Sequence, residues 1–320
     1  MFRALAAFLA GLALAACSAT ASPTLAPPTA SPTAAPTASA SPAAFPLTLI
    51  DDEGTAVSLA AEPQRIVSLS PANTETVFAL GAGARLVGGT DADDYPPEAG
   101  ALPDVATFQG VLMEQLVTLH PDLVLALGNG AKTPPDVVKI RDMGVPVIVL
   151  YAADVPGVVH DIELIGDAVG EGAAARTMTA LMQARIDAIS LATATLVHPR
   201  TFYELGADPE IYGPADDSFL ADMVRRAGGD PITTGSKTDY AISLERLVTA
   251  DPQVIVLATG PGYGDTAAQI AARPGWGVMT AVKTGALRPV DDVTVTRPGP
   301  RLAEGLAALA LAIHPDLVLP

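Results

Sequence analysis

The side chains that most often carry catalysis are few in this 320-residue sequence, and their spacing does not predict an active site. The four histidines are His120, His160, His198 and His314. No two of them have the spacing of metal ligands, and three directly precede a proline, as residues at element boundaries often do. Ser70 follows a predicted strand, but no histidine follows a matching strand to serve as its base. The residues therefore predict no enzyme, no cofactor and no bound metal ion.

The only cysteine, Cys17, directly follows an apolar run that begins after Arg3. That run is too short to cross a bilayer comfortably but fits the hydrophobic region of a signal peptide, which we place at residues 1–16. The sequence Leu14-Ala-Ala-Cys17 resembles the bacterial lipoprotein signal, in which cleavage before the cysteine leaves a lipid-bearing amino terminus. Two acyl chains are enough for stable anchoring, so we expect a protein held at the outer face of the cytoplasmic membrane.

Residues 17–44 comprise this cysteine and a segment that is almost wholly Ser, Thr, Ala and Pro. Such a composition cannot bury a core and keeps the backbone extended. At about 3 Å per residue the segment would reach on the order of 80 Å. We expect it to be a tether between the membrane and a folded body.

The charge and hydrophobicity of the chain limit the classes of protein to which it can belong. The formal net charge is −17, and the 18 basic residues are scattered, which argues against a nucleic-acid partner because phosphates require clustered Lys and Arg. Hydrophobic residues make up 49% of the chain, enough for two ordinary cores. Two domains are therefore expected.

One segment occurs twice, as Glu114-Gln-Leu-Val-Thr-Leu-His-Pro and as Glu245-Arg-Leu-Val-Thr-Ala-Asp-Pro. Each copy predicts a short helix opened by an acid, a turn before the proline, and then an apolar strand. An acid in the first turn is stabilised by the helix dipole by about 0.3–1 kcal/mol, which is one alternative explanation of both glutamates. Two copies of one unit indicate two lobes of similar build.

Strands alternate with helices through the folded body, which predicts α/β lobes with mostly parallel sheets. A hairpin is expected over 45–59, followed by a strand at 65–69 and by a helix that begins after Ser70. A long helix over 173–195 would span roughly 35 Å, enough to join two lobes. We therefore expect a first lobe at 45–172, an interlobe helix at 173–196 and a second lobe at 197–320.

Several segments occur in an order that resembles one protein family. They are Arg65-Ile-Val-Ser-Leu-Ser-Pro-Ala-Asn-Thr-Glu75, Asp94-Tyr-Pro-Pro97, Phe108-Gln-Gly110 and the two repeats. They are similar to the solute-binding proteins that serve ABC importers of vitamin B12 and ferric siderophores, and the vitamin B12-binding members have the most similar segments. The resemblance covers about residues 45–315. It implies two α/β lobes joined by one rigid helix, with the ligand between them.

The resemblance also implies how such a protein meets its transporter. Glu114 and Glu245 match the paired acids of the family, one on each lobe, that dock onto arginines of the membrane permease. The implied partners are an ABC permease with its ATPase, and a small metal chelate as ligand, with the protein acting as a monomer. Charged contacts of this kind mainly set orientation and association rate.

The ligand site that the resemblance implies has aromatic walls, formed by Tyr95, Phe108, Tyr212 and Tyr240, with Arg297 at its edge. Such walls suit a flat macrocycle or an aromatic chelate, because each ring buries a large area at little entropic cost. Vitamin B12-binding members have tryptophans where this chain has Phe108, Leu127 and Tyr240. Trp276 is expected in the core, and the adjacent acids Asp291-Asp292 are expected to be solvated.

The sequence thus predicts a membrane-anchored, non-catalytic solute-binding component of an ABC importer that takes up a corrinoid. The alternative ligands are a ferric siderophore or haem. More distant alternatives are a tethered hydrolase, since fold alone excludes no chemistry, and an adhesive or regulatory surface protein.

Overall fold

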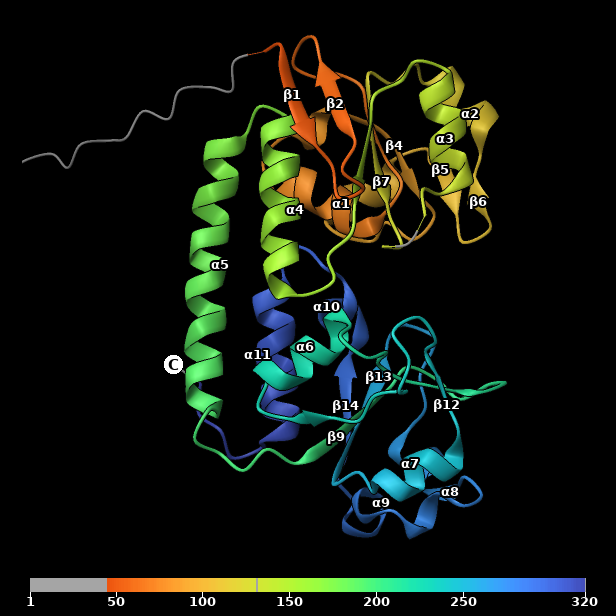
Figure 1. The fold of residues 1–320 in the computed structure, drawn as a ribbon, viewed down its shortest axis with the longest axis vertical. Coiled ribbons are helices and arrows are strands. Elements are labelled where there is room, and N and C mark those ends of the chain that lie inside the picture. Colours follow the sequence, from red (N-terminus) through yellow and green to blue (C-terminus); the bar gives the residue numbers. More distant parts are fainter. Residues whose placement is uncertain (1–44, 131, 320) are drawn as a thin grey trace, which may run out of the picture. The chain divides into compact units, whose positions relative to one another are not determined.

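The computed structural model of the protein describes residues 45–130 and 132–319, so the predicted signal peptide, Cys17 and the tether lie outside the described residues. The described chain forms two α/β lobes, one before and one after the long helix α5 (Gly172–Thr193; Figure 1). Each lobe contains one mostly parallel sheet. The predicted fold class is therefore confirmed, while the lobe boundaries at residues 172 and 197 stay a prediction.

The first lobe contains eight strands and four α-helices within the described residues. The strands are β1 (Leu47–Ile50), β2 (Ala56–Leu59), β3 (Ile66–Ser68), β4 (Leu86–Thr90), β5 (Asp104–Thr107), β6 (Gly110–Val111), β7 (Leu123–Leu127) and β8 (Val147–Leu150). The helices are α1 (Pro71–Ala79), α2 (Met113–Thr118), α3 (Pro135–Asp142) and α4 (Val155–Ala168), with 3₁₀ turns η1 (Gly83–Arg85) and η2 (Pro97–Ala101). Strands β1 and β2 form the predicted hairpin, and the main sheet has the order β6-β5-β4-β3-β7-β8.

The second lobe is built in the same way from six strands and six α-helices. The strands are β9 (Arg200–Glu204), β10 (Ile211–Tyr212), β11 (Asp230–Pro231), β12 (Ala241–Ile242), β13 (Val254–Thr259) and β14 (Leu287–Asp291). The helices are α6 (Phe219–Arg226), α7 (Leu244–Ala250), α8 (Ala267–Ala272), α9 (Thr280–Thr284), α10 (Asp292–Thr296) and α11 (Leu302–Ile313), with a 3₁₀ turn η3 (Trp276–Val278). The main sheet is wholly parallel, in the order β11-β9-β13-β14.

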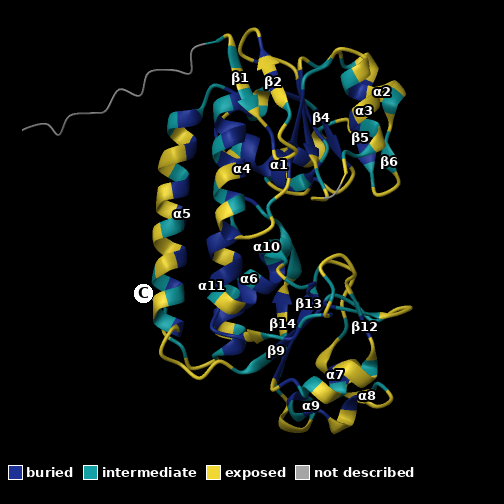
Figure 2. Ribbon diagram, in the orientation of Figure 1, coloured by how far each residue is buried: buried dark blue, intermediate teal, exposed yellow. Residues whose placement is uncertain are grey.

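Alternate residues of the central strands pack into different clusters, because successive side chains of a strand point to opposite faces of the sheet. In β7, Leu123 and Leu125 pack in the cluster that contains residues of α1 and α4, whereas Val124 and Ala126 pack in the cluster that contains residues of α2 and α3. Strand β13 alternates likewise between α6 and α11 on one face and α7, α8 and α9 on the other. Figure 2 shows these strands as buried. Both sheets are thus covered on both faces, as parallel sheets require.

The two copies of the repeat fold alike, as predicted, into α2 followed by β7 and α7 followed by β13. The turn before each proline contains a non-glycine residue with positive φ, His120 at 44° and Asp251 at 46°. An arginine at the start of the neighbouring strand donates hydrogen bonds to a backbone carbonyl of each turn. Arg65 donates to the carbonyl of Leu119 at 2.6 and 2.8 Å, and Arg200 donates to the equivalent carbonyl, that of Ala250, at 2.9 Å.

The two lobes share a continuous apolar core. One buried cluster contains Ile162 of α4, Ile186 of α5 and Leu306 of α11. The carboxylate of Asp222, in α6, accepts a hydrogen bond from the backbone N–H of Val155, the first residue of α4, at 3.1 Å. Separating the lobes would expose apolar surface, so we expect their relative motion to be small.

Helix α5 lies where the interlobe helix was predicted, and its 22 residues span about 33 Å at about 1.5 Å per residue. It packs against α4 and against α11. Between residues 45 and 319, residue 131 aside, no helix combines the length and the apolar character that crossing a bilayer requires.

Candidate functional site

Large aromatic side chains are exposed in the loops that follow the strands of both main sheets. They are Tyr95 after β4, Phe108 after β5, Tyr151 after β8 and Tyr263 after β13, with exposed fractions from 38% to 104%. Ligands of open parallel sheets bind at the carboxyl ends of the strands. This aromatic edge is therefore the candidate binding site.

Tyr212 and Tyr240 were predicted to line the second lobe's wall, and they lie together at the short antiparallel pair β10 and β12, with Tyr212 in β10 and Tyr240 directly before β12. Tyr212 is directly opposite Ala241, and the N–H of Gly213 donates to the carbonyl of Tyr240 at 2.9 Å. The Tyr240 ring is half-exposed, and that of Tyr212 is partly buried. This antiparallel pair keeps both phenols at one place on the second lobe.

Tyr151 of the first lobe lies close enough to Tyr240 of the second to act on it electrostatically. Burial raises the pKa of the Tyr240 phenol, and the neighbouring Tyr151 phenol raises that pKa further. Tyr151 was not among the residues predicted from the sequence. Its position directly after the predicted strand that ends at Leu150 was the signal that could have identified it.

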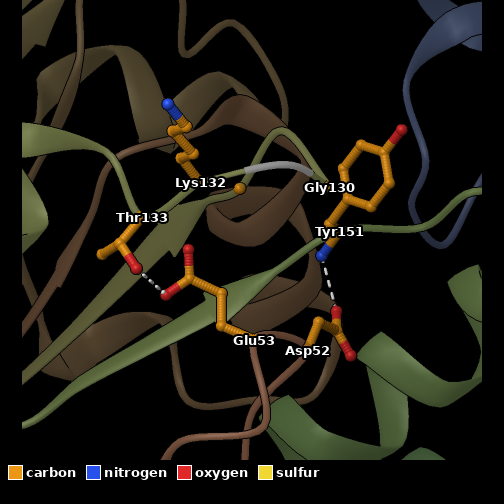
Figure 3. Close-up of a pocket in the computed structure, with 7 residues that line it drawn as sticks. Asp52, Glu53, Gly130, Lys132, Thr133 and Tyr151 are labelled. Atoms are coloured by element: carbon orange, nitrogen blue, oxygen red, sulfur yellow. Dashed lines mark hydrogen bonds between the residues drawn. The ribbon is translucent and has the colours of Figure 1, made fainter.

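A hollow of about 440 Å³ lies beside Tyr151 in the first lobe (Figure 3). It is lined by Asp52, Glu53, Gly128, Gly130, Lys132, Thr133 and Tyr151. The backbone N–H of Tyr151 donates to Asp52 at 2.5 Å, and the Thr133 hydroxyl donates to Glu53 at 2.8 Å. A Cβ on Gly130 would lie 2.4 Å from the Tyr151 ring, so this glycine allows the ring to lie against the backbone. The turn between β1 and β2 thus fixes the backbone of Tyr151, and Gly130 makes room for its ring.

The acid that holds Tyr151 has a second carboxyl group as its neighbour. Burial raises the pKa of Asp161, on α4, to about 9, and the adjacent Asp52 carboxylate contributes to the rise. Asp161 is therefore protonated at neutral pH.

A buried cluster of charges joins the lobes beside Tyr95. Glu75 of α1 accepts two hydrogen bonds from Arg301, at 2.8 and 2.9 Å, and is 3.4 Å from Arg297. Arg297 also pairs with Asp94 at 2.7 Å, and the Arg301 guanidinium lies 4.0 Å from the centre of the Tyr95 ring. Arg297 was predicted at the ligand's edge, and here it is engaged in ion pairs within the protein. Arg301, four residues later in the sequence, was missed.

The adjacent acids Asp291-Asp292 differ from what was expected. Asp292 is not simply solvated, because its carboxylate accepts hydrogen bonds from Tyr203 at 2.9 Å and from Tyr263 at 3.1 Å. The expectation failed because the partner tyrosines are distant in the sequence. Trp276 is buried in the second lobe's core, as predicted.

Glu114 and Glu245 occupy matching positions in the first turns of α2 and α7. Both side chains are exposed, and neither forms an ion pair with another described residue. The Ser243 hydroxyl caps α7 by accepting from the N–H of Arg246. A hollow of about 560 Å³ lies beside Glu245 and Arg246. The structure thus presents an exposed glutamate on each lobe, at equivalent places in the two repeats.

The histidines form no site in the part of the chain that the structure describes. His198 and His314 each contact a backbone carbonyl oxygen, at 3.3 and 3.0 Å. Across residues 45–130 and 132–319, no group of three or more His, Cys, Asp or Glu side chains is placed to hold a metal ion.

These features are those of a two-lobe solute-binding protein. They are two α/β lobes with one long connecting helix, aromatic rings at the strand ends of both lobes, and an exposed acid in each repeat. The family model described as periplasmic binding protein matches residues 66–293, and the chain belongs to that family. It is accordingly a solute-binding component of transport and not an enzyme.

Known proteins similar to this chain agree with that assignment. An uncharacterised ABC transporter substrate-binding lipoprotein of Bacillus subtilis is 34% identical over 282 residues, which cover 85% of this chain and 87% of that protein. A cobalamin-binding protein of Halobacterium salinarum is 33% identical over 280 residues, covering 84% of this chain and 74% of that protein. The crystal structure of a periplasmic haem-binding protein from Pseudomonas aeruginosa matches with a TM-score of 0.70 and 27% identity, over 81% of this chain and 95% of that one.

Proposed function

We propose that this protein captures a corrinoid between its lobes and delivers it to the permease of an ABC importer. The observation that carries the proposal is the set of exposed aromatic rings at the strand ends of both lobes. A corrinoid offers a broad macrocyclic face, and ring contacts with such a face bury large areas at little entropic cost. The 33% identity to a cobalamin-binding protein supports this ligand.

Capture in this form needs little movement of the lobes. The continuous core and the Glu75–Arg301 pair hold them together, so the ligand enters a largely pre-formed site. A pre-formed site lowers the entropic cost of binding. The corrinoid is cargo in this scheme, and the protein has no resident cofactor.

Delivery depends on Glu114 and Glu245. Each exposed carboxylate would meet an arginine of the permease, and the two contacts together would fix the orientation of the complex. The ATPase of the importer supplies the energy for transport. The protein acts as a monomer, with one lobe on each half of the permease.

Anchoring depends on Cys17, which lies outside the described residues. The similarity to a lipoprotein of Bacillus subtilis supports lipid attachment at this cysteine. The Ser/Thr/Ala/Pro-rich tether would then hold the folded body near the outer face of the cytoplasmic membrane.

The second candidate ligand is haem or a ferric siderophore. The aromatic edge favours it in one respect, since most of its rings carry a phenol and a tyrosine oxygen can ligate haem iron. The similarity to a haem-binding protein of Pseudomonas aeruginosa supports this alternative.

Thermal unfolding distinguishes these ligands. The chain from residue 18 onward is heated alone and with cyanocobalamin, cobinamide, haemin or several ferric siderophores. A ligand at about a hundred times its Kd adds roughly 2.7 kcal/mol to the free energy of unfolding, which raises Tm by several degrees. We expect this shift with the corrinoids. A shift with haemin or ferric chelates alone would contradict the corrinoid proposal.

A further inference from the structure

The loop Gly260-Pro-Gly-Tyr-Gly264, directly after β13, is shaped around one aromatic ring. Gly260 and Tyr263 exchange two backbone hydrogen bonds, both at 3.2 Å, which close the loop. A Cβ on Gly260 would lie 2.2 Å from the Tyr263 ring, so the ring lies against the glycine backbone, where any other side chain would displace it. Gly264 has a φ of 94°, and its backbone lies so close to the carbonyl oxygen of Ala258 that a Cβ would not fit there either.

The far end of the same ring is also fixed. The Tyr263 hydroxyl donates to the carboxylate of Asp292 at 3.1 Å, and the other oxygen of that carboxylate accepts from Tyr203 at 2.9 Å. Tyr203 is completely buried in β9, so the acid is itself held by the core. The ring is therefore fixed at its hydroxyl and against its glycine, yet 47% of Tyr263 is exposed.

Electrostatic neighbours place this ring beside the junction of the lobes. Burial, followed by the adjacent Asp292 carboxylate, raises the pKa of Tyr263 to about 12, and the Arg297 cation acts in the opposite direction. Arg297 is ion-paired with Asp94 of the first lobe, the residue next to Tyr95. Tyr263 is thus on the same side of the second lobe as the ion pairs that reach Tyr95.

We propose that Tyr263 is a rigid aromatic platform for the flat face of a conjugated macrocycle, with Asp292 as the residue that positions it. The ring lies against the Gly260 backbone, and 47% of Tyr263 remains exposed to receive a ligand. An exposed ring that is already immobilised loses little freedom on binding, which favours stacking. This inference rests on the proposed function and extends it, because it names a contact that determines specificity for planar ligands.

The test compares variants of the chain from residue 18 onward by calorimetric titration and by the visible absorbance spectrum of the bound ligand. Cyanocobalamin and haemin are the probes. Tyr263→Ala removes the platform, Tyr263→Phe keeps the ring without its hydroxyl, and Asp292→Asn removes the charged acceptor. Val278→Ala is the control, because Val278 is 55% exposed in the same lobe and lies in the separate turn η3. Thermal unfolding of each variant reports whether it is folded.

We expect Tyr263→Ala to weaken binding of the macrocycle by about tenfold, and Tyr263→Phe by less than about threefold. The effect of Asp292→Asn on affinity should fall between these two. It should also alter the spectrum of the bound ligand, because the Tyr263 ring loses the acceptor that positions it. A merely structural role of Asp292 would leave that spectrum unchanged. Wild-type affinity and an unaltered spectrum in Tyr263→Ala would overturn the inference.

The two probes separate this inference from the proposed ligand. If the wild type binds only haemin and Tyr263→Ala weakens that binding, the platform stands while the corrinoid proposal fails. If the wild type binds cyanocobalamin and Tyr263→Ala binds it equally well, the inference about Tyr263 is wrong and the corrinoid proposal is kept. Binding of neither macrocycle by the wild type would overturn both.

Discussion

Arg301 donates two hydrogen bonds to the carboxylate of Glu75, from Nε to Oε1 at 2.8 Å and from Nη2 to Oε2 at 2.9 Å. The arginine directly precedes α11 in the second lobe, and the glutamate lies in α1 of the first. Only 2% of Glu75 is exposed. The pair is thus a buried, two-pronged connection between lobes, and it lies directly against Tyr95.

Glu75→Gln is expected to lower the free energy of unfolding by about 2–4 kcal/mol, because two arginines would lose their buried counter-charge. Urea unfolding measures this. The control is Glu62→Gln, which weakens the more exposed Arg85–Glu62 pair and should change stability by less than about 0.5 kcal/mol. Equal effects of the two substitutions would show that Glu75 does not join the lobes energetically.

The double variant Glu114→Ala and Glu245→Ala is expected to abolish uptake of the ligand by cells while its affinity for the ligand stays unchanged. The reason is that both carboxylates are exposed and unpaired with any described residue, and neither belongs to the aromatic edge. Uptake assays and calorimetry are the measurements. Glu304→Ala, an exposed acid in the first turn of α11, should leave uptake intact. Normal uptake by the double variant would refute docking through these residues.

The raised pKa of Asp161, about 9, predicts an unusual pH dependence. Between about pH 4 and pH 9 the folded state binds a proton at this carboxyl that the unfolded state releases, so the carboxyl's contribution to stability declines as pH rises. Asp161→Asn cannot titrate. We expect it to be more stable than wild type by about 1–3 kcal/mol at pH 7.5, with a difference that grows over this range.

Urea unfolding at several pH values measures that difference. Asp187→Asn, at an exposed position on α5, should show no such trend. A constant difference between wild type and Asp161→Asn from pH 4 to pH 9 would mean that Asp161 ionises normally in the folded state.

Phe108→Trp is expected to increase affinity for cyanocobalamin about two- to tenfold. Phe108 is fully exposed between β5 and β6, and an indole offers a larger face for stacking on a macrocycle. Calorimetric titration measures the change, and Val138→Trp, on α3, is the control. Unchanged or weaker binding in Phe108→Trp would place this residue outside the ligand site.

The sequence was most informative where its signals were local and periodic. The repeat predicted α2 with β7 and α7 with β13, and the long pattern after Gly172 predicted α5. The structure of the second lobe after residue 259 was harder to predict from the sequence. Its helices α8, α9 and α10 have five or six residues each, too few for a helical period to emerge between glycines and prolines.

The candidate site was only partly accessible from the sequence. Tyr95 and Phe108 lie in segments with a family resemblance, whereas Tyr151 and Tyr263 do not. A tyrosine directly after a buried strand can be recognised by the rule that ligands bind at the carboxyl ends of parallel strands. The partners of Asp292 could not be recognised, because Tyr203 reaches it across 89 positions of sequence.

The most direct measurement is a calorimetric titration of the chain from residue 18 onward with cyanocobalamin, repeated at two temperatures. We predict one site with a Kd below about 1 μM and a negative heat-capacity change, as expected when aromatic walls bury an apolar face. Tyr151→Ala with Tyr240→Ala should weaken this binding. The absence of any heat with cyanocobalamin, together with tight binding of haemin or a ferric siderophore, would contradict the corrinoid as ligand.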